Sequence, residues 1–250
     1  MALLWRREAG GRRYELRAAG RTLRLYTDGV LHTAWNPARP FAGHVWDLLV
    51  LPAFLLEPPP RRVLALGVGG GAAIRTLRER LAPESVVGVD HDPVHLQVAR
   101  RFFGVRGRGV RLVRADARDW VAAWNGPPFD LVIDDLFGGR GEPQRAVAPD
   151  TAWLMALARL VSATGALVVN CVSARELAGC GWRLSPGLQR RLPGALALST
   201  PREENAVGAF FRHPIAARDL WRALEGQPGL DPRRTAARRR YRVRRLAPAA

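Results

Sequence analysis

Four carboxylates stand at or just past the ends of short apolar runs that are predicted to be strands. They are Asp90 after 86–89, Asp116 after 110–113, and Asp134 and Asp135 after 131–133. The carboxyl ends of parallel strands meet at one edge of a sheet, which is where α/β proteins bind ligands. Carboxylates at that edge can accept hydrogen bonds from sugar hydroxyls or amines, and they can take a proton from a reacting group.

A glycine-rich turn follows another apolar run, 63–66, and leads into a predicted helix over 72–81. Its glycines are Gly67, Gly69, Gly70 and Gly71. Glycine lets the backbone turn sharply and approach a ligand, and a helix N-terminus offers unpaired N–H groups. Asp90 then ends the next strand, where its carboxylate can accept from two ribose hydroxyls, so the unit predicts a nucleoside site. The glycines alone would also fit tight strand-to-helix packing, and Asp90 alone would fit a solvated loop or a helix cap.

Two other acids also have alternative interpretations. Asp116 either accepts from the exocyclic amine of a purine or caps the predicted helix that carries Trp120 and Trp124. Adjacent carboxylates repel each other, which raises the pKa of one of them, so Asp135 is the candidate base. In the alternative, Asp134 and Asp135 only begin an acid-rich loop.

The elements that must position these residues alternate as in a doubly wound α/β domain. Further helices are predicted over 93–102 and 151–162, and further strands over 166–172, 195–199 and 206–211, before a helix over 215–225. The segment 138–149 is rich in Gly, Pro and charge, and it is long enough to be a lid. The predicted fold class is therefore α/β: a Rossmann-like, mainly parallel sheet.

A smaller unit is predicted before this domain. Residues 14–33 alternate apolar and polar positions around turn signals at 19–20 and 28–29, which indicates an antiparallel β unit. An apolar helix-like stretch over 45–56 ends at a run of prolines. We therefore expect three parts: 1–57 with the β unit and connecting helix, 58–232 as the catalytic domain, and 233–250 as an Arg-rich tail.

Composition limits the location and the cofactors. With 48% hydrophobic residues the chain can build a core, yet it has no apolar run that would span a bilayer and no signal peptide, so we expect a cytoplasmic protein without membrane contact. Cys171 and Cys180 are too few for a disulfide framework or a metal cluster, and no metal is assigned.

The net charge of +17 comes from arginine, because the sequence contains no lysine. Together with the many Ala, Gly and Pro residues, this bias is typical of a GC-rich genome. The segment 233–245 is still locally basic, and such runs are usually solvated or disordered ends. A nucleic acid is thus an alternative partner that the sequence does not favour.

Five segments resemble the spermidine synthase (polyamine aminopropyltransferase) family, which has an AdoMet-dependent methyltransferase-like fold. Residues 28–32 are similar to its Asp-Gly-Val-hydrophobic-Gln, with His32 in place of Gln, and Asp47 stands where the family has the acid of Tyr-His/Gln-Glu. The other three segments are 67–71, similar to Gly-Gly-Gly-Asp-Gly, 116–117, similar to Asp-Gly or Asp-Ala, and 129–135, similar to the run that ends in the proposed catalytic Asp. The similarity extends over about residues 14–211.

The resemblance implies a role for each matching residue. Asp135 would be the catalytic residue, acting as the base or orienting the nucleophile. The cofactor-binding residues would be His32, Gly67, Gly69, Gly70, Gly71, Asp90, Asp116 and Ala117. Asp47 and Asp134 would contact the substrate. We expect no tightly bound cofactor, a co-substrate that is decarboxylated S-adenosylmethionine or S-adenosylmethionine itself, and a homodimer.

Two departures from the family pattern concern charge. Gly70 replaces the aspartate that would hold the aminopropyl ammonium, and Gly138 replaces a second acid that helps to hold the polyamine. Polyamines are cations that need convergent carboxylates. Losing the acid at Gly70 also removes a charge that would repel an amino acid carboxylate, and this would open the pocket to ordinary S-adenosylmethionine.

The predicted function is aminopropyl transfer from an adenosyl-sulfonium donor to a small-molecule amine. The first alternative is methyl transfer from S-adenosylmethionine to an unknown acceptor. A non-catalytic nucleoside-binding or interaction protein is an alternative of another class. A nicotinamide-dependent oxidoreductase would share the unit from Gly67 to Asp90, but the resemblance elsewhere disfavours it.

Overall fold

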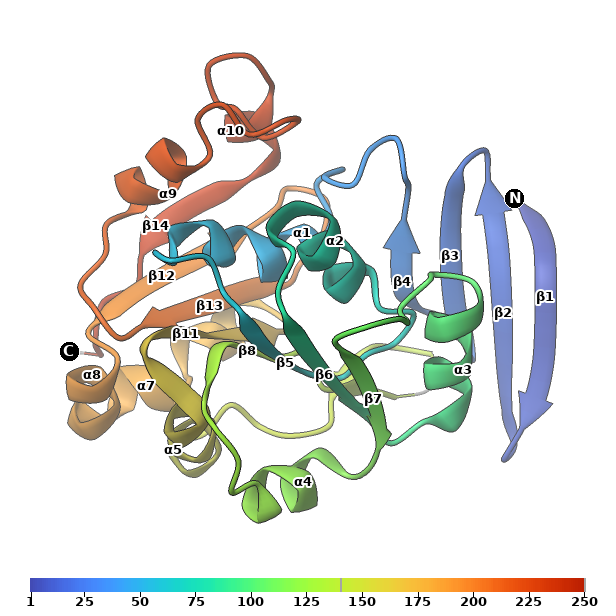
Figure 1. Ribbon diagram of the computed structural model, residues 1–250, viewed down its shortest axis with the longest axis horizontal. Coiled ribbons are helices and arrows are strands. Elements are labelled where there is room, and N and C mark those ends of the chain that lie inside the picture. The colour runs from blue at the N-terminus through green and yellow to red at the C-terminus, as the bar shows by residue number, and fades with distance from the viewer. Residues whose placement is uncertain (140, 250) are drawn as a thin grey trace.

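A mainly parallel sheet with helices on both faces forms the centre of the molecule in a computed structural model, which describes residues 1–139 and 141–249 (Figure 1). The sheet order over these residues is β14-β12-β13-β11-β8-β5-β6-β7. The strands are β5 Arg62–Leu66, β6 Ser85–Asp90, β7 Val110–Arg114, β8 Phe129–Asp134, β11 Val161–Cys171, β12 Gly194–Ser199, β13 Ala206–Phe211 and β14 Arg242–Arg245. Pairing is parallel from β11 through β7 and antiparallel from β11 through β14. The predicted α/β class and Rossmann-like sheet are confirmed.

The central strands are apolar at nearly every position because both of their faces are covered. In β5, Val63 and Ala65 face the cluster beneath α1, α2 and α9, whereas Leu64 and Leu66 face the cluster beneath α4 and α5. All four are at most 2% exposed. The burial of both faces explains why these strands read as continuous apolar runs, which made them easy to predict.

The helices on the two faces begin and end close to the predicted limits where the prediction was specific. They are α1 Val45–Val50, α2 Ala72–Leu81, α3 Pro93–Arg101, α4 Ala117–Ala123, α5 Thr151–Leu160, α6 Ala174–Ala178, α7 Gly181–Leu184, α8 Pro186–Arg191, α9 Ala217–Ala223 and α10 Ala237–Arg240. Asp92, Asp116 and Asp150 accept backbone N–H groups at the starts of α3, α4 and α5. The predicted helix over 45–56 is instead α1 followed by the 3-10 turn η1 Leu51–Leu55, where Pro52 lacks the N–H that would continue the α-helix.

A separate antiparallel sheet packs beside the central one, at the side of the N-terminus (Figure 1). It contains β1 Ala2–Ala9, β2 Arg12–Ala19, β3 Thr22–Thr27 and β4 Val30–Trp35 in that order. The predicted β unit is thus present, and β1 lies outside its predicted range. Tyr14, Leu16 and Leu25 of this sheet join the same apolar cluster as β5, so the boundary at 57/58 stays a prediction.

The Arg-rich segment differs from the solvated or disordered end that its charge indicated. Strand β14 pairs with β12, and Ala237 and Tyr241 are 0% and 1% exposed. Apolar residues spaced among the arginines point inward, while Arg242 and Arg244 remain exposed, so a count of charge alone was misleading. Of the predicted tail 233–250, Ala250 lies outside the described residues.

The predicted lid contains a short hairpin of β9 Phe137–Gly138 and β10 Gln144–Arg145. Arg140, within the predicted range 138–149, lies outside the described residues. In the part of the chain that the structure describes, no helix has the length and apolar character needed to cross a bilayer.

Candidate active site

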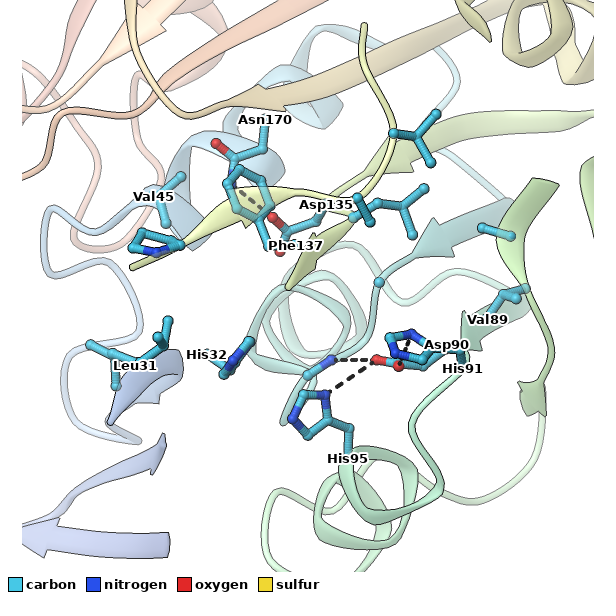
Figure 2. A pocket seen from close by; sticks show the side chains of 18 of the residues that line it. Leu31, His32, Val45, Val89, Asp90, His91, His95, Asp135, Phe137 and Asn170 are labelled. Carbon is cyan, nitrogen blue, oxygen red and sulfur yellow. Dashed lines mark hydrogen bonds and ion pairs between the residues drawn. The ribbon is translucent and has the colours of Figure 1, made fainter. Parts of the chain in front are cut away.

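A cavity of about 510 Å³ opens beyond the carboxyl ends of the parallel strands. Seven predicted site residues line it: His32, Gly67, Gly69, Asp90, Asp116, Ala117 and Asp135. The other four, Asp47, Gly70, Gly71 and Asp134, do not line it. Figure 2 shows two groups of polar side chains, one around Asp90 and His95 and the other around Asp135 and Asn170. We call the first the Asp90 side and the second the Asp135 side.

Asp90 is 6% exposed and is held by backbone N–H groups. One carboxylate oxygen accepts from the N–H groups of Val68 and Gly69, both at 3.0 Å, and the other accepts from that of Asp92 at 2.9 Å. Although burial opposes ionisation, contacts with His95 and these N–H groups outweigh it, and they lower the pKa of Asp90 to about 2. Asp90 is therefore an anion at neutral pH and can accept hydrogen bonds from a ligand.

The glycine turn offers fewer N–H groups than the sequence indicated. Besides the two N–H groups bound to Asp90, that of Gly70 donates to the Thr33 hydroxyl at 2.7 Å, and that of Gly71 donates to the carbonyl of Val68 at 2.7 Å. A pyrophosphate would need such groups for itself. The turn thus favours a nucleoside without a phosphate and disfavours a dinucleotide.

His32 and His95 lie side by side next to Asp90, with ring centroids 4.8 Å apart. His95 Nε2 forms a hydrogen bond with the Thr27 hydroxyl at 2.8 Å, whereas the buried Nε2 of His32 has no partner among the described residues. Burial, with His95 adding to it, lowers the pKa of His32 to about 3. A neutral imidazole at the cavity wall can donate to or accept from a ligand hydroxyl.

Asp116 lies at the cavity and also caps α4. Its carboxylate accepts from the N–H of Arg118 at 2.7 Å and from that of Asp119 at 3.4 Å. The helix-cap interpretation is therefore realised, and Asp116 and Ala117 both border the cavity, where an adenine would meet them. Their part in base binding stays a prediction.

Gly67 brings the glycine turn against the end of β8. It has a φ of +83°, and a Cβ there would collide with the backbone carbonyl of Asp135. The N–H of Asp135 donates to the Leu66 carbonyl at 2.8 Å. Only glycine allows this approach, which places Asp135 in the same cavity as Asp90.

Asp135 is held by a chain of amides. Asn170 Nδ2 donates to its Oδ1 at 2.7 Å (Figure 2). Asn205 Nδ2 in turn donates to Asn170 Oδ1 at 3.1 Å. Burial, with repulsion from Asp134 adding to it, raises the pKa of Asp135 to about 6 even though Asn170 opposes the shift. A carboxylate with this pKa can take up and release a proton near neutral pH.

Asp134 faces the core rather than the cavity. It is 0% exposed, and its Oδ2 accepts from Arg145 Nη2 at 2.7 Å and from Trp153 Nε1 at 2.9 Å. Side chains of a strand alternate between its faces, so Asp134 and Asp135 cannot both point into the same cavity. The expected substrate contact of Asp134 is replaced by a buried ion pair that anchors β10.

Asp47 likewise lies away from the cavity. It is 5% exposed, and its Oδ2 accepts from the N–H groups of Gly43 and His44 and from the Tyr241 hydroxyl. An acid in the first turn of a helix is well placed to bind such N–H groups. Asp47 therefore has a structural role at the start of α1, and its hydrogen bonds account for a carboxylate at this position without any contact to a substrate.

Gly70 does not open the cavity. A Cβ there would meet the Phe103 ring and the Thr33 side chain, each at 2.9 Å. Thr33 and Phe103 fill the space that a longer side chain would need, so Gly70 in place of an aspartate removes a charge without adding room. Gly138, by contrast, has open space at its Cβ position, and the acid expected from the family pattern is simply missing there.

Several residues of the Asp135 side had not been predicted. Glu203 accepts from His44 Nδ1 at 2.8 Å and from the Val45 N–H at 2.6 Å, and it lines the cavity together with Trp46. Asn170 could have been found as a polar residue at the end of an apolar strand. Glu203 and Asn205 gave no comparable signal, because they lie in a loop between two antiparallel strands.

The fold is methyltransferase-like, and residues 63–149 match the family described as a methyltransferase domain. A curated relative, the polyamine aminopropyltransferase of Vibrio vulnificus, is 34% identical over 133 residues, which are 52% of this chain and 44% of the relative. Over this part the chain is similar to the spermidine synthase family. The matched part of the chain spans under half of the relative's length.

Solved structures show the same fold. A probable spermidine synthase from Corynebacterium glutamicum has a TM-score of 0.71 at 19% identity, covering 91% of this chain and 88% of that one. A spermidine synthase in complex with the transition-state analogue AdoDATO has a TM-score of 0.64 at 14% identity, covering 88% and 75%. At these identities the likeness supports the fold alone.

Proposed function

We propose that this protein transfers the aminopropyl group of decarboxylated S-adenosylmethionine to an amine. The observation that carries the proposal is the cavity in which Asp90, ionised at neutral pH, and Asp135, with a pKa of about 6, face a common space. Asp90 and His32 would bind the ribose, and Asp116 and Ala117 would border the adenine. Relatives named polyamine aminopropyltransferase support this reaction.

The reaction is a single displacement. The amine nitrogen attacks the carbon next to the sulfonium, a C–N bond forms, and the C–S bond breaks with its electron pair going to sulfur. The products are an alkylated amine and the neutral thioether methylthioadenosine. The nitrogen releases one proton, and Asp135 Oδ2 would accept it, because Oδ1 is already bound by Asn170. The remaining contribution of the protein is to hold the two reactants in line.

Methyl transfer from S-adenosylmethionine is the second candidate, and the methyltransferase-domain match favours it. The structure offers it no extra room at Gly70, where Thr33 and Phe103 fill the space. No acid occupies that position, however, so the amino acid carboxylate of S-adenosylmethionine would meet no repelling charge from it.

Product analysis distinguishes the two reactions. Purified protein is incubated with decarboxylated S-adenosylmethionine and a panel of mono- and diamines, and in parallel with S-adenosylmethionine and the same panel. We expect methylthioadenosine from the first reaction and no S-adenosylhomocysteine from the second. Release of S-adenosylhomocysteine with no methylthioadenosine would replace the proposal with methyl transfer, and release of neither product would favour a non-catalytic role.

The proposal also includes the oligomeric state, the location in the cell and the partners of the protein. We expect a homodimer in light scattering and a cytoplasmic location. Nucleic acid remains a disfavoured partner, because the Arg-rich segment belongs to the central sheet through β14. Retention on immobilised DNA or RNA that falls when Arg238, Arg239 and Arg242 are replaced by Gln would overturn that last expectation.

A further inference from the structure

The amino end of α1 forms the wall of the Asp135 side. Val45 and Trp46 line the cavity from this helix, and Glu203 lines it from the loop between β12 and β13. Glu203 binds both the side chain of His44 and the N–H of Val45. Any shift of this helix end would therefore move an indole and a carboxylate that an acceptor must meet.

A buried carboxylate holds that helix end. Asp47 Oδ2 accepts from the N–H of Gly43 at 2.6 Å, from the N–H of His44 at 3.1 Å and from the Tyr241 hydroxyl at 2.7 Å. Burial raises the pKa of Asp47, while these three donors favour its ionised form. The hydroxyl thus helps to keep an acceptor of two backbone N–H groups in place inside the core.

Tyr241 comes from the opposite end of the chain, 194 positions from Asp47. It is 1% exposed and directly precedes β14, whose pairing with β12 fixes its backbone. The loop after β12 is joined to the same place, since the Thr200 hydroxyl donates to the Gly43 carbonyl at 2.8 Å. Three distant segments therefore meet behind the cavity wall, outside the cavity itself.

We propose that Tyr241 is a positioning residue for the Asp135 side, so that the Arg-rich C-terminal segment sets the geometry of the acceptor site. Its hydroxyl holds Asp47, and Asp47 holds the amino end of α1. That end carries Trp46 and binds Glu203, which together shape the space beside Asp135. The functional part of this inference rests on the proposed transfer reaction, whereas its structural part can be measured without any ligand.

The test is Tyr241→Phe, which removes the hydroxyl and keeps the buried ring. In hydrogen–deuterium exchange, we expect the amides of Gly43, His44 and Val45 to exchange about tenfold faster than in the wild type, because a hydrogen bond that holds the buried Asp47 carboxyl group is lost. In calorimetry, affinity for AdoDATO, which as a transition-state analogue spans donor and acceptor, should fall about tenfold. Affinity for methylthioadenosine should change less than about twofold.

Tyr14→Phe is the matched control. The Tyr14 hydroxyl donates to Asp92 Oδ2 at 2.7 Å, and Asp92 caps α3 directly after Asp90, so this variant removes an equivalent bond behind the Asp90 side. It should weaken the binding of both ligands equally and leave hydrogen–deuterium exchange at 43–45 unchanged.

In steady-state kinetics, Tyr241→Phe should raise the KM for the amine and not that for the donor.

The outcomes are separable. Unchanged exchange at 43–45 in Tyr241→Phe would overturn the inference even if both ligands bind as expected. Equal loss of AdoDATO and methylthioadenosine affinity in Tyr241→Phe would also overturn it, because the effect would then be general. If the wild type binds neither ligand, the proposed function fails, and faster exchange restricted to Tyr241→Phe would still support the structural part.

Discussion

The two sides of the cavity contain the same type of acid in opposite electrostatic states. Asp90 is buried, but contacts with His95 and with backbone N–H groups outweigh this burial and lower its pKa to about 2. Asp135 has one amide donor from a distant strand and an acidic neighbour, and its pKa is raised to about 6. At neutral pH the first carboxylate is therefore charged, whereas the second lies close to its pKa, which suits the binding and proton-accepting roles that we propose for them.

The other buried acids on the two sides of the cavity also have different partners. On the Asp90 side, Asp92 caps α3 and accepts from Tyr14. On the Asp135 side, Asp134 and Asp47 are both buried, and they accept from Arg145 and Tyr241, respectively. Asp90 itself is bound by N–H groups at most 22 positions away, whereas the amide donor of Asp135, Asn170, is 35 positions away.

The largest expected effect comes from Asp135→Asn. If Asp135 takes the proton, turnover should fall by about 10²–10⁴-fold, the usual contribution of a positioned general base. Affinity for methylthioadenosine should be nearly unchanged, because the proposed function places that ligand on the Asp90 side. Turnover is measured by methylthioadenosine release and affinity by calorimetry. Wild-type turnover in this variant would remove Asp135 from the mechanism.

The buried ion pair gives the next largest effect. Arg145→Met leaves Asp134 uncompensated in the core, which should lower the free energy of unfolding by about 3–5 kcal/mol in urea titrations. The double variant Asp134→Leu with Arg145→Met should recover most of this loss, since no buried charge remains. A double variant as unstable as Arg145→Met would mean that Arg145 acts through its contact with the carbonyl of Asn170 instead.

Asp90→Ala should weaken ligand binding on the Asp90 side alone. We expect affinity for methylthioadenosine to fall about 100-fold, because hydrogen bonds to a charged group contribute about 1.5–3 kcal/mol. Three N–H groups would also lose their acceptor, so stability should fall by about 1–3 kcal/mol, a loss that the sequence alone did not indicate. Asp116→Ala, which removes a helix cap, is the control with a smaller loss of stability. Unchanged ligand affinity in Asp90→Ala would contradict the ribose assignment.

The sequence predicted the Asp90 side better than the Asp135 side for the same physical reason. Gly67, Gly69 and Asp90 lie within one βαβ unit, so their spacing already implies their proximity. Glu203 and Tyr241 reach the Asp135 side only through antiparallel strands at the far end of the sheet, and no local pattern marks such contacts. Asp47 shows that a matching motif position does not fix where a side chain points.

The pH dependence of stability should have opposite signs on the two sides. The pKa of Asp135 is raised from 3.8 to about 6 on folding, so the folded state binds its proton more tightly than the unfolded state does. Its contribution to stability is fully present below about pH 4 and is lost as the pH rises through about 6. At about 1.4 kcal/mol per pKa unit, the loss is about 2–3 kcal/mol.

Urea titrations of the wild type and Asp135→Asn at pH 4.5 and 7.5 measure this loss, because the Asn variant lacks the titration. The wild type should lose more stability than the variant between the two pH values. For Asp90, the pKa is lowered on folding to about 2. Its contribution to stability is therefore fully present above about pH 4 and is lost as the pH falls through about 2. Parallel pH profiles of the wild type and Asp135→Asn would mean that Asp135 is ionised as easily as Asp90, and the electrostatic difference between the two sides would no longer hold.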